Sequence, residues 1–295
     1  MSHSAAYKGP EPYAGQRVLV VGVGSSGADL AVEVSEVAAC VRLSAVRGAW
    51  SVPRYAGKLP FDHQATRLSA MLPEPLRTRL FHRRLLGLYR QLKLDHTRLV
   101  TEAFDPPRSR LTPGTELLDA IHAGRITVHP GLARLEPGVV VFTDGARAAI
   151  DAILYCTGYQ LSLPYLRPGL VEINHNRLPL YKSVFSPDHP GLAFVGFFQT
   201  TGAIPPVAEM QARWVARVLA GRASLPAPEA QRADISAQLA AWRASGAPSQ
   251  RLPWLAYMDE LAGFIGARPR LWRRPWRLAR MLLGPVEPKQ YREKW

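Results

Sequence analysis

A short apolar run that leads directly into a glycine-rich turn constrains this chain more than any other feature. The run Arg17–Val21 reads RVLVV, and the turn Gly22–Gly27 reads GVGSSG, which matches the pattern G-x-G-x-x-G. Apolar residues at helical spacing predict a helix over 28–37, and a second apolar run predicts a strand at 41–44. Strand, turn, helix and strand in this order predict one βαβ unit of a parallel sheet.

The residues of the turn each meet a physical requirement of dinucleotide binding. Gly22 permits a tight turn, Gly24 lets the backbone approach a pyrophosphate, and Gly27 lets the helix pack closely on the strand. The helix N-terminus, with Ser25 and Ser26, offers N–H groups and the positive end of the helix dipole to the anion. Because the motif lies between a strand and a helix, dinucleotide binding is favoured over a turn used only for packing.

The segment at the end of the second strand indicates which dinucleotide is bound. NAD-binding proteins usually place Asp or Glu there to hold the ribose hydroxyls, but no carboxylate occurs between Glu36 and Asp62. Ser44 and Arg47 occupy this segment, and both can donate hydrogen bonds to a 2′-phosphate. The sequence therefore predicts NADP, and the alternative interpretation of Arg47 is a solvated loop residue.

The remaining sequence predicts an inserted helical segment and further strands. One or two amphipathic helices are expected within 60–104, with arginines opposite an apolar face that comprises Leu76, Leu80, Phe81, Leu85, Leu88 and Leu92. Strands are expected at 126–128, 139–142, 150–156 and 192–196. A helix is expected from Pro205–Pro206 to Gly221, with proline in its first turn.

Composition excludes several classes of protein and favours a cytoplasmic one. Cys40 and Cys156 form no C-x-x-C pair, and the eight histidines show no metal-ligand spacing, so no redox dithiol or metal site is predicted. The chain shows no secretory signal and no apolar stretch of about 20 residues that would span a membrane. The net charge of +14 comes from scattered arginines without a nucleic-acid-binding module. The basic stretch Arg268–Leu283 fits either packing on the fold, which we prefer, or a membrane surface.

Further segments along the whole chain share the order and register of one enzyme family. They are His3–Lys8, Asp151–Tyr159, Leu180–Phe185, Ala193–Gln199, Gly202–Pro205, Gln211–Trp214, Tyr257–Ala262, Leu283–Pro285, Gln290–Arg292 and Trp295. They resemble the flavin-containing monooxygenase family of the N,N-dimethylaniline monooxygenase type, including the end of its fingerprint, its A-T-G-Y strand, its L-Y-K-x-V-F segment and its Q-A-R-W helix. Tyr7 stands where the related Baeyer–Villiger enzymes usually carry Trp, which argues against that group.

The resemblance implies an NADPH- and FAD-dependent monooxygenase. NADPH would reduce the flavin, O2 would form a C4a-hydroperoxide on it, and the distal oxygen would pass to a small molecule with a nucleophilic nitrogen or sulfur. Thr157, Gly158 and Tyr159 would lie near the nicotinamide nucleotide, although Tyr159 is equally consistent with packing. Gln199 and Thr200 would face the flavin edge. The cofactor carries the chemistry, so the resemblance assigns no catalytic side chain.

The expected fold class is α/β, with a Rossmann-like doubly wound NADP domain and the C-terminal portion of a FAD/NAD(P)-binding domain. We expect a linker with the end of the fingerprint at 1–14, the NADP-binding domain at 15–155 with the helical insertion at about 60–104, and the FAD-domain portion at 156–295. The chain contains a single G-x-G-x-x-G, and the family carries its FAD motif upstream of the fingerprint.

We therefore expect the FAD-pyrophosphate unit to be missing from this chain. Either the start of the gene is mis-assigned or the gene is broken, or the FAD part is a separate chain. Apolar surface after Tyr159 would then be exposed and require a partner chain or a homo-oligomer. The alternative function is a non-catalytic NADP-binding fragment or module.

Overall fold

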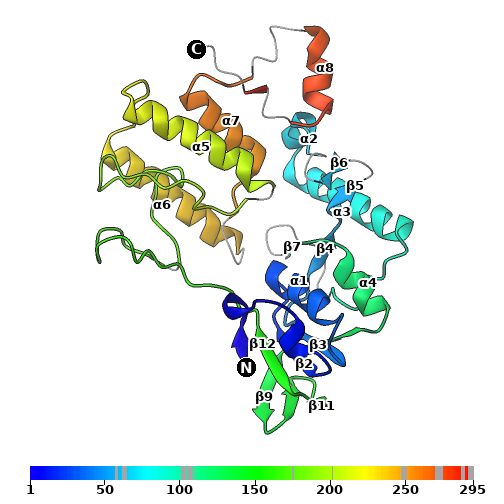
Figure 1. Ribbon diagram of the computed structural model, residues 1–295. Helices are drawn as coiled ribbons and strands as arrows, with labels where there is room; N and C mark the ends of the chain where they lie inside the picture. The colour runs from blue at the N-terminus through cyan, green and yellow to red at the C-terminus, as the bar shows by residue number, and fades with distance from the viewer. Residues whose placement is uncertain are drawn as a thin grey trace. The chain divides into compact units, whose positions relative to one another are not determined.

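The computed structural model divides the chain into two compact units (Figure 1). Unit 1 comprises Met1–Phe61 and Glu74–Tyr159, and unit 2 comprises Asp62–Pro73 and Gln160–Trp295. The division after Tyr159 lies close to the expected boundary at residue 155, but 62–73 groups with unit 2 rather than with the nucleotide domain. The residues described are 1–56, 59–61, 65–100, 104, 109, 111–174, 176–200, 202–246, 251–269, 275–286 and 290–291.

Unit 1 is built on a five-stranded sheet in the order β1-β12-β2-β3-β8, and every neighbouring pair is parallel. The strands are β1 (Ser2–His3), β2 (Arg17–Val21), β3 (Cys40–Ser44), β8 (Ile126–His129) and β12 (Ala152–Tyr155). Helix α1 (Ser25–Val34) connects β2 to β3, and α4 (Glu116–His122) precedes β8. The α/β fold class is therefore confirmed. Within the segment 1–14 that was expected to be a linker, β1 extends the sheet beside β12.

Both faces of strand β2 are buried, which explains its uninterrupted apolar sequence. Val18 and Val20 belong to the core cluster that α1 and α4 cover, whereas Leu19 belongs to a cluster on the other face. An antiparallel three-stranded sheet contributes Val140 and Phe142 to that second cluster. Its strands are β9 (Leu132–Glu136), β10 (Val139–Phe142) and β11 (Arg147–Ala149) (Figure 1). Each fully buried aliphatic side chain stabilises the fold by about 1.5–3 kcal/mol.

Short elements complete unit 1 around α3 (Glu74–Gln91). They are η1 (Ser4–Ala6), η2 (Glu11–Tyr13), β4 (Trp50–Val52) paired with β7 (Leu111–Pro113), and β5 (Tyr55–Ala56) paired with β6 (Leu59–Pro60). The helix predicted here is present, but its expected single apolar face is wrong. Leu85 is fully buried, whereas Leu76 and Leu80 are nearly half exposed. Nine residues separate Leu76 from Leu85, which is two and a half turns, so they point to opposite sides of α3.

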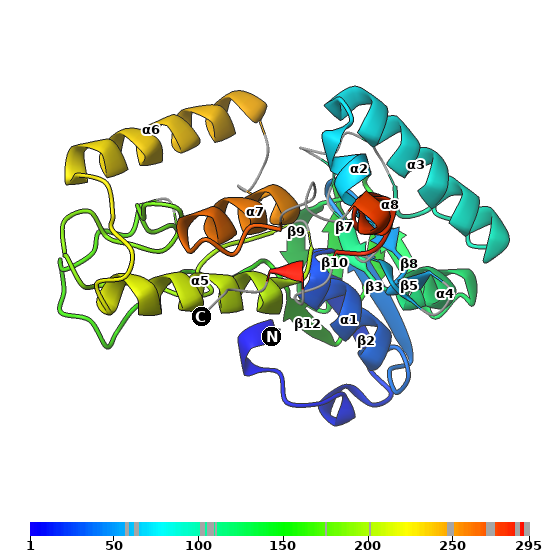
Figure 2. The same cartoon turned by 90° about the horizontal axis from the view of Figure 1, so that it is seen from above.

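Unit 2 is mainly helical, with α5 and α7 side by side (Figure 2). Its helices are α2 (Arg67–Met71), α5 (Ile204–Leu219), α6 (Pro228–Ser245), α7 (Trp254–Phe264) and α8 (Pro275–Leu283). Val207, Met210 and Trp214, spaced three and four residues apart on α5, are buried. The strand expected at 192–196 is absent from the described residues, where Ala193 forms only an isolated bridge to Phe185. In the C-terminal stretch, Trp272, Arg292 and Trp295 lie outside the described residues.

Candidate functional site

The glycine-rich turn brings three strand ends and a helix into close contact. Gly22 has φ +107°, and a Cβ atom there would lie 2.6 Å from the carbonyl oxygen of Cys156. A Cβ atom on Gly27 would lie only 2.0 Å from the carbonyl oxygen of Gly22. The Gly22 N–H donates to the Ser44 carbonyl oxygen at 3.0 Å, which ties the turn to the end of β3. Only glycine fits at these two positions. This is the requirement predicted for a glycine-rich turn that joins a strand to a closely packed helix.

The N-terminus of α1 is left open by its own sequence. Gly24 is the N-cap residue in an extended conformation, and no side chain there caps the helix. The first turn contains no carboxylate, so no negative charge opposes an incoming anion there. Ser25 is exposed and Ser26 is half-buried. This arrangement presents the backbone N–H groups and the positive end of the helix dipole to an anionic group.

The two residues expected to hold a 2′-phosphate differ in their surroundings. The Ser44 side chain is buried, and its hydroxyl donates to the Pro130 carbonyl oxygen at 2.9 Å. A hydroxyl has a single hydrogen to donate, so Ser44 could donate to a 2′-phosphate only if this bond were broken. Arg47 is exposed in the loop after β3 and forms no ion pair with the described residues. Its guanidinium is therefore free to reach a ligand.

The segment Thr157–Tyr159 is exposed where it leaves β12, and it contacts the end of the fingerprint. Gly158 has φ +102°, in the region that favours glycine. The Tyr159 hydroxyl forms a 3.0 Å hydrogen bond with the Ser4 hydroxyl, and its ring meets His3 edge-on with centroids 5.5 Å apart. The sequence identified both segments but not their contact. The contact shows that Tyr159 packs, while its side chain remains accessible to a ligand.

Strand β12 ends next to a buried thiol. Cys156 is buried, and burial raises the pKa of its thiol to about 11. A thiol with so high a pKa is protonated and unreactive at neutral pH. Cys156 is therefore a packing residue at the end of a strand.

Gln199 and Thr200 belong to unit 2, where the backbone around them is fixed by residue 252. The Leu252 N–H donates to the Gln199 carbonyl oxygen at 2.8 Å, and the Thr200 hydroxyl donates to the Leu252 carbonyl oxygen at 3.2 Å. The Gln199 side chain is exposed and makes no hydrogen bond with the residues that the structure describes. These contacts leave the Gln199 amide available to a ligand, while its backbone is held in place.

A buried polar network in unit 2 supports the segment that leads to Gln199, and no local sequence pattern indicated it. The Gln211 side chain is fully buried; its Oε1 accepts from the Gly196 N–H at 2.9 Å and its Nε2 donates to the Tyr257 hydroxyl at 2.8 Å. Tyr257 in turn donates to the Lys182 carbonyl oxygen, and burial raises the pKa of Tyr257. The three family-like segments containing Lys182, Gln211 and Tyr257 were recognisable in sequence, but their mutual contacts were not.

The Lys182 side chain joins this network to α6 and makes a second contact with α7. Its ammonium group forms ion pairs with Asp234 at 2.6 Å and Glu260 at 2.8 Å. Elsewhere in unit 2, the buried Arg67 guanidinium bonds to the Asp259 carboxylate and, at 2.9 Å, to the Tyr291 hydroxyl. Because buried charges require partners, these networks fix how the helices of unit 2 pack.

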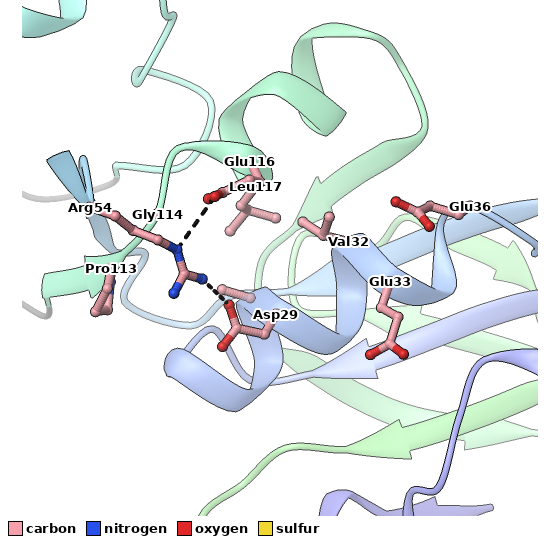
Figure 3. A pocket seen from close by; sticks show the side chains of 10 residues that line it. Asp29, Val32, Glu33, Glu36, Arg54, Pro113, Gly114, Glu116 and Leu117 are labelled. Atoms are coloured by element: carbon pink, nitrogen blue, oxygen red, sulfur yellow. Dashed lines mark hydrogen bonds and ion pairs between the residues drawn. The ribbon is translucent and has the colours of Figure 1, made fainter. Parts of the chain in front are cut away.

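A surface cleft of about 320 Å³ lies along the outer side of α1 in unit 1 (Figure 3). Arg54 spans it with ion pairs to Asp29 at 3.1 Å and Glu116 at 3.4 Å. Glu33 and Glu36 also line the cleft. The excess of carboxylates opposes a phosphate group, so this cleft does not suit the phosphates of a nucleotide.

Within the described ranges, no group of three or more His, Cys, Asp or Glu side chains has a geometry that would hold a metal ion. None of the helices in the same ranges combines the length and apolar character needed to cross a membrane.

The chain is similar to known proteins over almost all of its length. It matches the family model described as flavin-binding monooxygenase-like over residues 1–294. It is 33% identical over 307 residues to flavin-containing monooxygenase 5 of Homo sapiens, and the aligned region covers 98% of this chain and 57% of the relative. It is 34% identical over 304 residues to dimethylaniline monooxygenase (N-oxide-forming) 4 of Mus musculus, covering 98% and 54%. The chain thus spans little more than half the length of these relatives.

Solved structures are also similar over most of this chain. S-allyl-L-cysteine S-oxygenase from Allium sativum has a TM-score of 0.58 and 25% identity, covering 99% of this chain and 54% of that chain. Cyclohexanone monooxygenase from Rhodococcus sp. Phi1 bound to NADP+ has a TM-score of 0.59 and 15% identity, covering 90% and 68%. The second similarity supports the fold alone.

Proposed function

Because the chain belongs to the flavin-binding monooxygenase-like family, we propose that it carries the NADPH-binding domain and part of the FAD-binding domain of a flavin-dependent monooxygenase. Family membership confirms the resemblance found in the sequence motifs. Unit 1 would bind NADPH, and unit 2 would contribute the portion of the FAD-binding domain that follows it in the chain. The expected boundaries at 14, 155 and 295 remain a prediction for these roles.

The close approach at Gly27 is the observation that carries the NADPH assignment. A Cβ atom there would lie 2.0 Å from a backbone oxygen, so α1 starts directly against the strand, as pyrophosphate binding requires. The backbone N–H groups at Gly24, Ser25 and Ser26 would hold the pyrophosphate, and Arg47 would pair with the 2′-phosphate. The exposed Thr157 and Gly158 lie at the end of β12, the neighbour of β2, where the nicotinamide half would extend.

Gln199 and Thr200 would lie at the flavin edge. When bound, NADPH supplies a hydride to FAD, and the reduced flavin activates O2 for transfer of one oxygen atom. The protein's part is to hold both cofactors and exclude water. The fixed backbone at Gln199 and Thr200, bonded to Leu252, suits such a positioning role.

The substrate class is a small molecule with a nucleophilic nitrogen or sulfur. Relatives described as N-oxide-forming and as an S-oxygenase act on these two elements. A Baeyer–Villiger activity is less favoured, because the similarity to cyclohexanone monooxygenase extends to the fold alone and Tyr7 replaces the tryptophan usual in that group.

A non-catalytic NADP-binding fragment is the second candidate. It is favoured by the single G-x-G-x-x-G of this sequence. A separate chain or a second copy of this chain would then supply the remaining FAD-binding surface. The two candidates differ in flavin content, because only the oxygenase retains FAD.

Calorimetric titration with NADPH and NADH tests the cofactor assignment. Wild-type protein should prefer NADPH, and Arg47→Ala should weaken NADPH binding about tenfold to a hundredfold, because a hydrogen bond to a charged group contributes about 1.5–3 kcal/mol. Its NADH affinity should not change. Arg125→Ala, which removes another exposed arginine of unit 1, should bind both as wild type does. Equal affinity of the wild-type protein for the two nucleotides would refute the role of Arg47.

A visible absorption spectrum after mixing with FAD and removing the excess separates the two candidates. A retained flavin band that NADPH bleaches supports the monooxygenase. Tight NADPH binding without a flavin band supports the NADP-binding fragment. If neither cofactor bound, both candidates would be wrong for this chain.

A further inference from the structure

Helix α3 (Glu74–Gln91) has an outward face that the proposed oxygenase function leaves unused. Its inner face packs into the core of unit 1 through Leu85 and Tyr89, which are 0% and 2% exposed. The Tyr89 hydroxyl donates to the Ser51 carbonyl oxygen and fastens the helix. On the outside, Leu76 is 45% and Leu80 is 47% exposed. Two aliphatic side chains thus point away from a firmly attached helix.

The outward leucines form the centre of a strip with arginines on both sides. At about 100° per residue, Leu76, Leu80 and Gly87 fall within about 40° of one another around the helix axis. The flanking arginines are all exposed. They are Arg77 and Arg84 on one side and Arg79, Arg83 and Arg90 on the other. The single carboxylate of α3 is Glu74 at its first residue, and none of these arginines forms an ion pair with the described residues.

We propose that this outward face of α3 binds the surface of an anionic lipid bilayer. Arginine guanidinium groups would pair with lipid phosphates, while Leu76 and Leu80 would enter the boundary between headgroups and acyl chains. Arginine suits this depth because its apolar stem reaches over acyl chains while its charge stays at the headgroups. The helix lies in the plane of the surface, because its inner face remains packed in the core of unit 1.

The exposed leucines distinguish a bilayer from a nucleic acid. Five arginines alone would suit either partner, because both carry phosphates. A nucleic acid would meet the centre of the strip with its charged backbone, which gives Leu76 and Leu80 no apolar environment. A bilayer places charge at the flanks and apolar material at the centre, in the same order as the helix. Charge and apolar complementarity together therefore favour lipid.

Co-sedimentation of the whole chain with vesicles tests the proposal. We expect binding to vesicles of equal parts phosphatidylcholine and phosphatidylglycerol, little binding to phosphatidylcholine alone, and weaker binding at high salt. Each arginine near such a surface strengthens binding about fivefold. The triple variant Arg77→Gln, Arg83→Gln, Arg84→Gln should therefore bind about a hundredfold more weakly. The double variant Leu76→Ser, Leu80→Ser should bind about tenfold more weakly, from the loss of apolar burial.

A matched variant separates α3 from net charge. Arg125→Gln, Arg167→Gln, Arg222→Gln removes the same charge from exposed positions elsewhere, and it should bind like wild type. Circular dichroism and urea unfolding should match wild type for all variants. Wild-type binding by the α3 triple variant, or an equal loss in the matched variant, would overturn the proposal. Binding of a DNA duplex by α3 without vesicle binding would assign the face to nucleic acid instead.

Discussion

Replacing Gly27 with alanine tests the close packing of helix α1 on strand β2. The added Cβ would lie 2.0 Å from the Gly22 carbonyl oxygen, 2.8 Å from its carbonyl carbon and 3.3 Å from the Cβ of Cys156. The shortest of these is about 1.4 Å below the 3.4 Å at which ordinary contact begins. Both Gly22 atoms are backbone, so no side-chain rotation relieves the overlap, and α1 must move away from the turn.

The expected loss of stability combines two opposing effects. Overpacking usually costs about 1–3 kcal/mol, and a clash with backbone belongs near the upper value. Alanine in a helix is favoured over glycine by about 1 kcal/mol, which offsets part of that cost. Gly27→Ala should therefore lower the free energy of unfolding by about 2 kcal/mol. For a domain of this size, that corresponds to a fall in Tm of about 4–8 °C.

Gly87→Ala is the matched control, because the same change is made inside a helix without a clash. No atom lies within 4 Å of the Cβ that would be added at Gly87 in α3. The control should raise stability by about 0.5–1 kcal/mol. Urea unfolding followed by circular dichroism measures both variants. NADPH titration should show about tenfold weaker binding for Gly27→Ala, from the loss of one charged hydrogen bond, and unchanged binding for Gly87→Ala.

The two substitutions must therefore change stability in opposite directions. If Gly27→Ala were as stable as wild type and bound NADPH equally well, the helix would not need to approach the strand so closely. The assignment of the turn to pyrophosphate binding would then lose its main support.

Three further predictions concern single side chains. Gln211→Leu should lower the free energy of unfolding, measured by urea unfolding, by about 2 kcal/mol, because it leaves buried partners such as Tyr257 without a hydrogen bond. An unchanged free energy of unfolding would show that water replaces the amide. The hydrogen bonds from Arg17 lower the pKa of Asp151 from 3.8 to about 2, so the pair stabilises the fold above about pH 4 and this is lost as the pH falls toward 2. Asp151→Asn should be less stable than wild type at pH 7, with a difference that shrinks toward pH 2; a difference independent of pH would contradict this. Burial lowers the pKa of His96 below 6.5, so wild type should lose stability as the pH falls from 7 to 5, and His96→Phe should lose less; identical pH profiles would refute it.

Local sequence patterns predicted several elements at nearly their observed bounds. Strand β2 spans Arg17–Val21, the range expected from its apolar run. Helix α5 spans Ile204–Leu219, within two residues of the predicted ends, because proline fits the first turn and Gly221 adopts a left-handed conformation after the helix. Such signals depend on a residue's own backbone preference, which is the same in any fold.

The predictions that failed depended on what each segment packs against. At 192–196, where a strand was expected, Ala193 forms only an isolated bridge to Phe185. Apolar residues favour a strand, but they do not supply the partner strand that a sheet requires. The ligand role expected of Ser44 stays a prediction, although the sequence did not show that its hydroxyl bonds to the Pro130 carbonyl oxygen brought there by another strand. The leucines of α3 face in opposite directions. Their spacing matches the helical repeat only approximately, so over 17 residues they do not stay on one side of the helix.

The sequence by itself determined the βαβ unit, its glycine-rich turn and the family, because these rest on short patterns with steric causes. Tertiary structure decided which distant groups meet. It joined Ser4 to Tyr159 and placed Gln211 between Gly196 and Tyr257. It also left Leu76 of α3 on the outside. A hydrogen bond needs its two atoms within about 3 Å, and only the packing of whole strands and helices brings such separate residues that close.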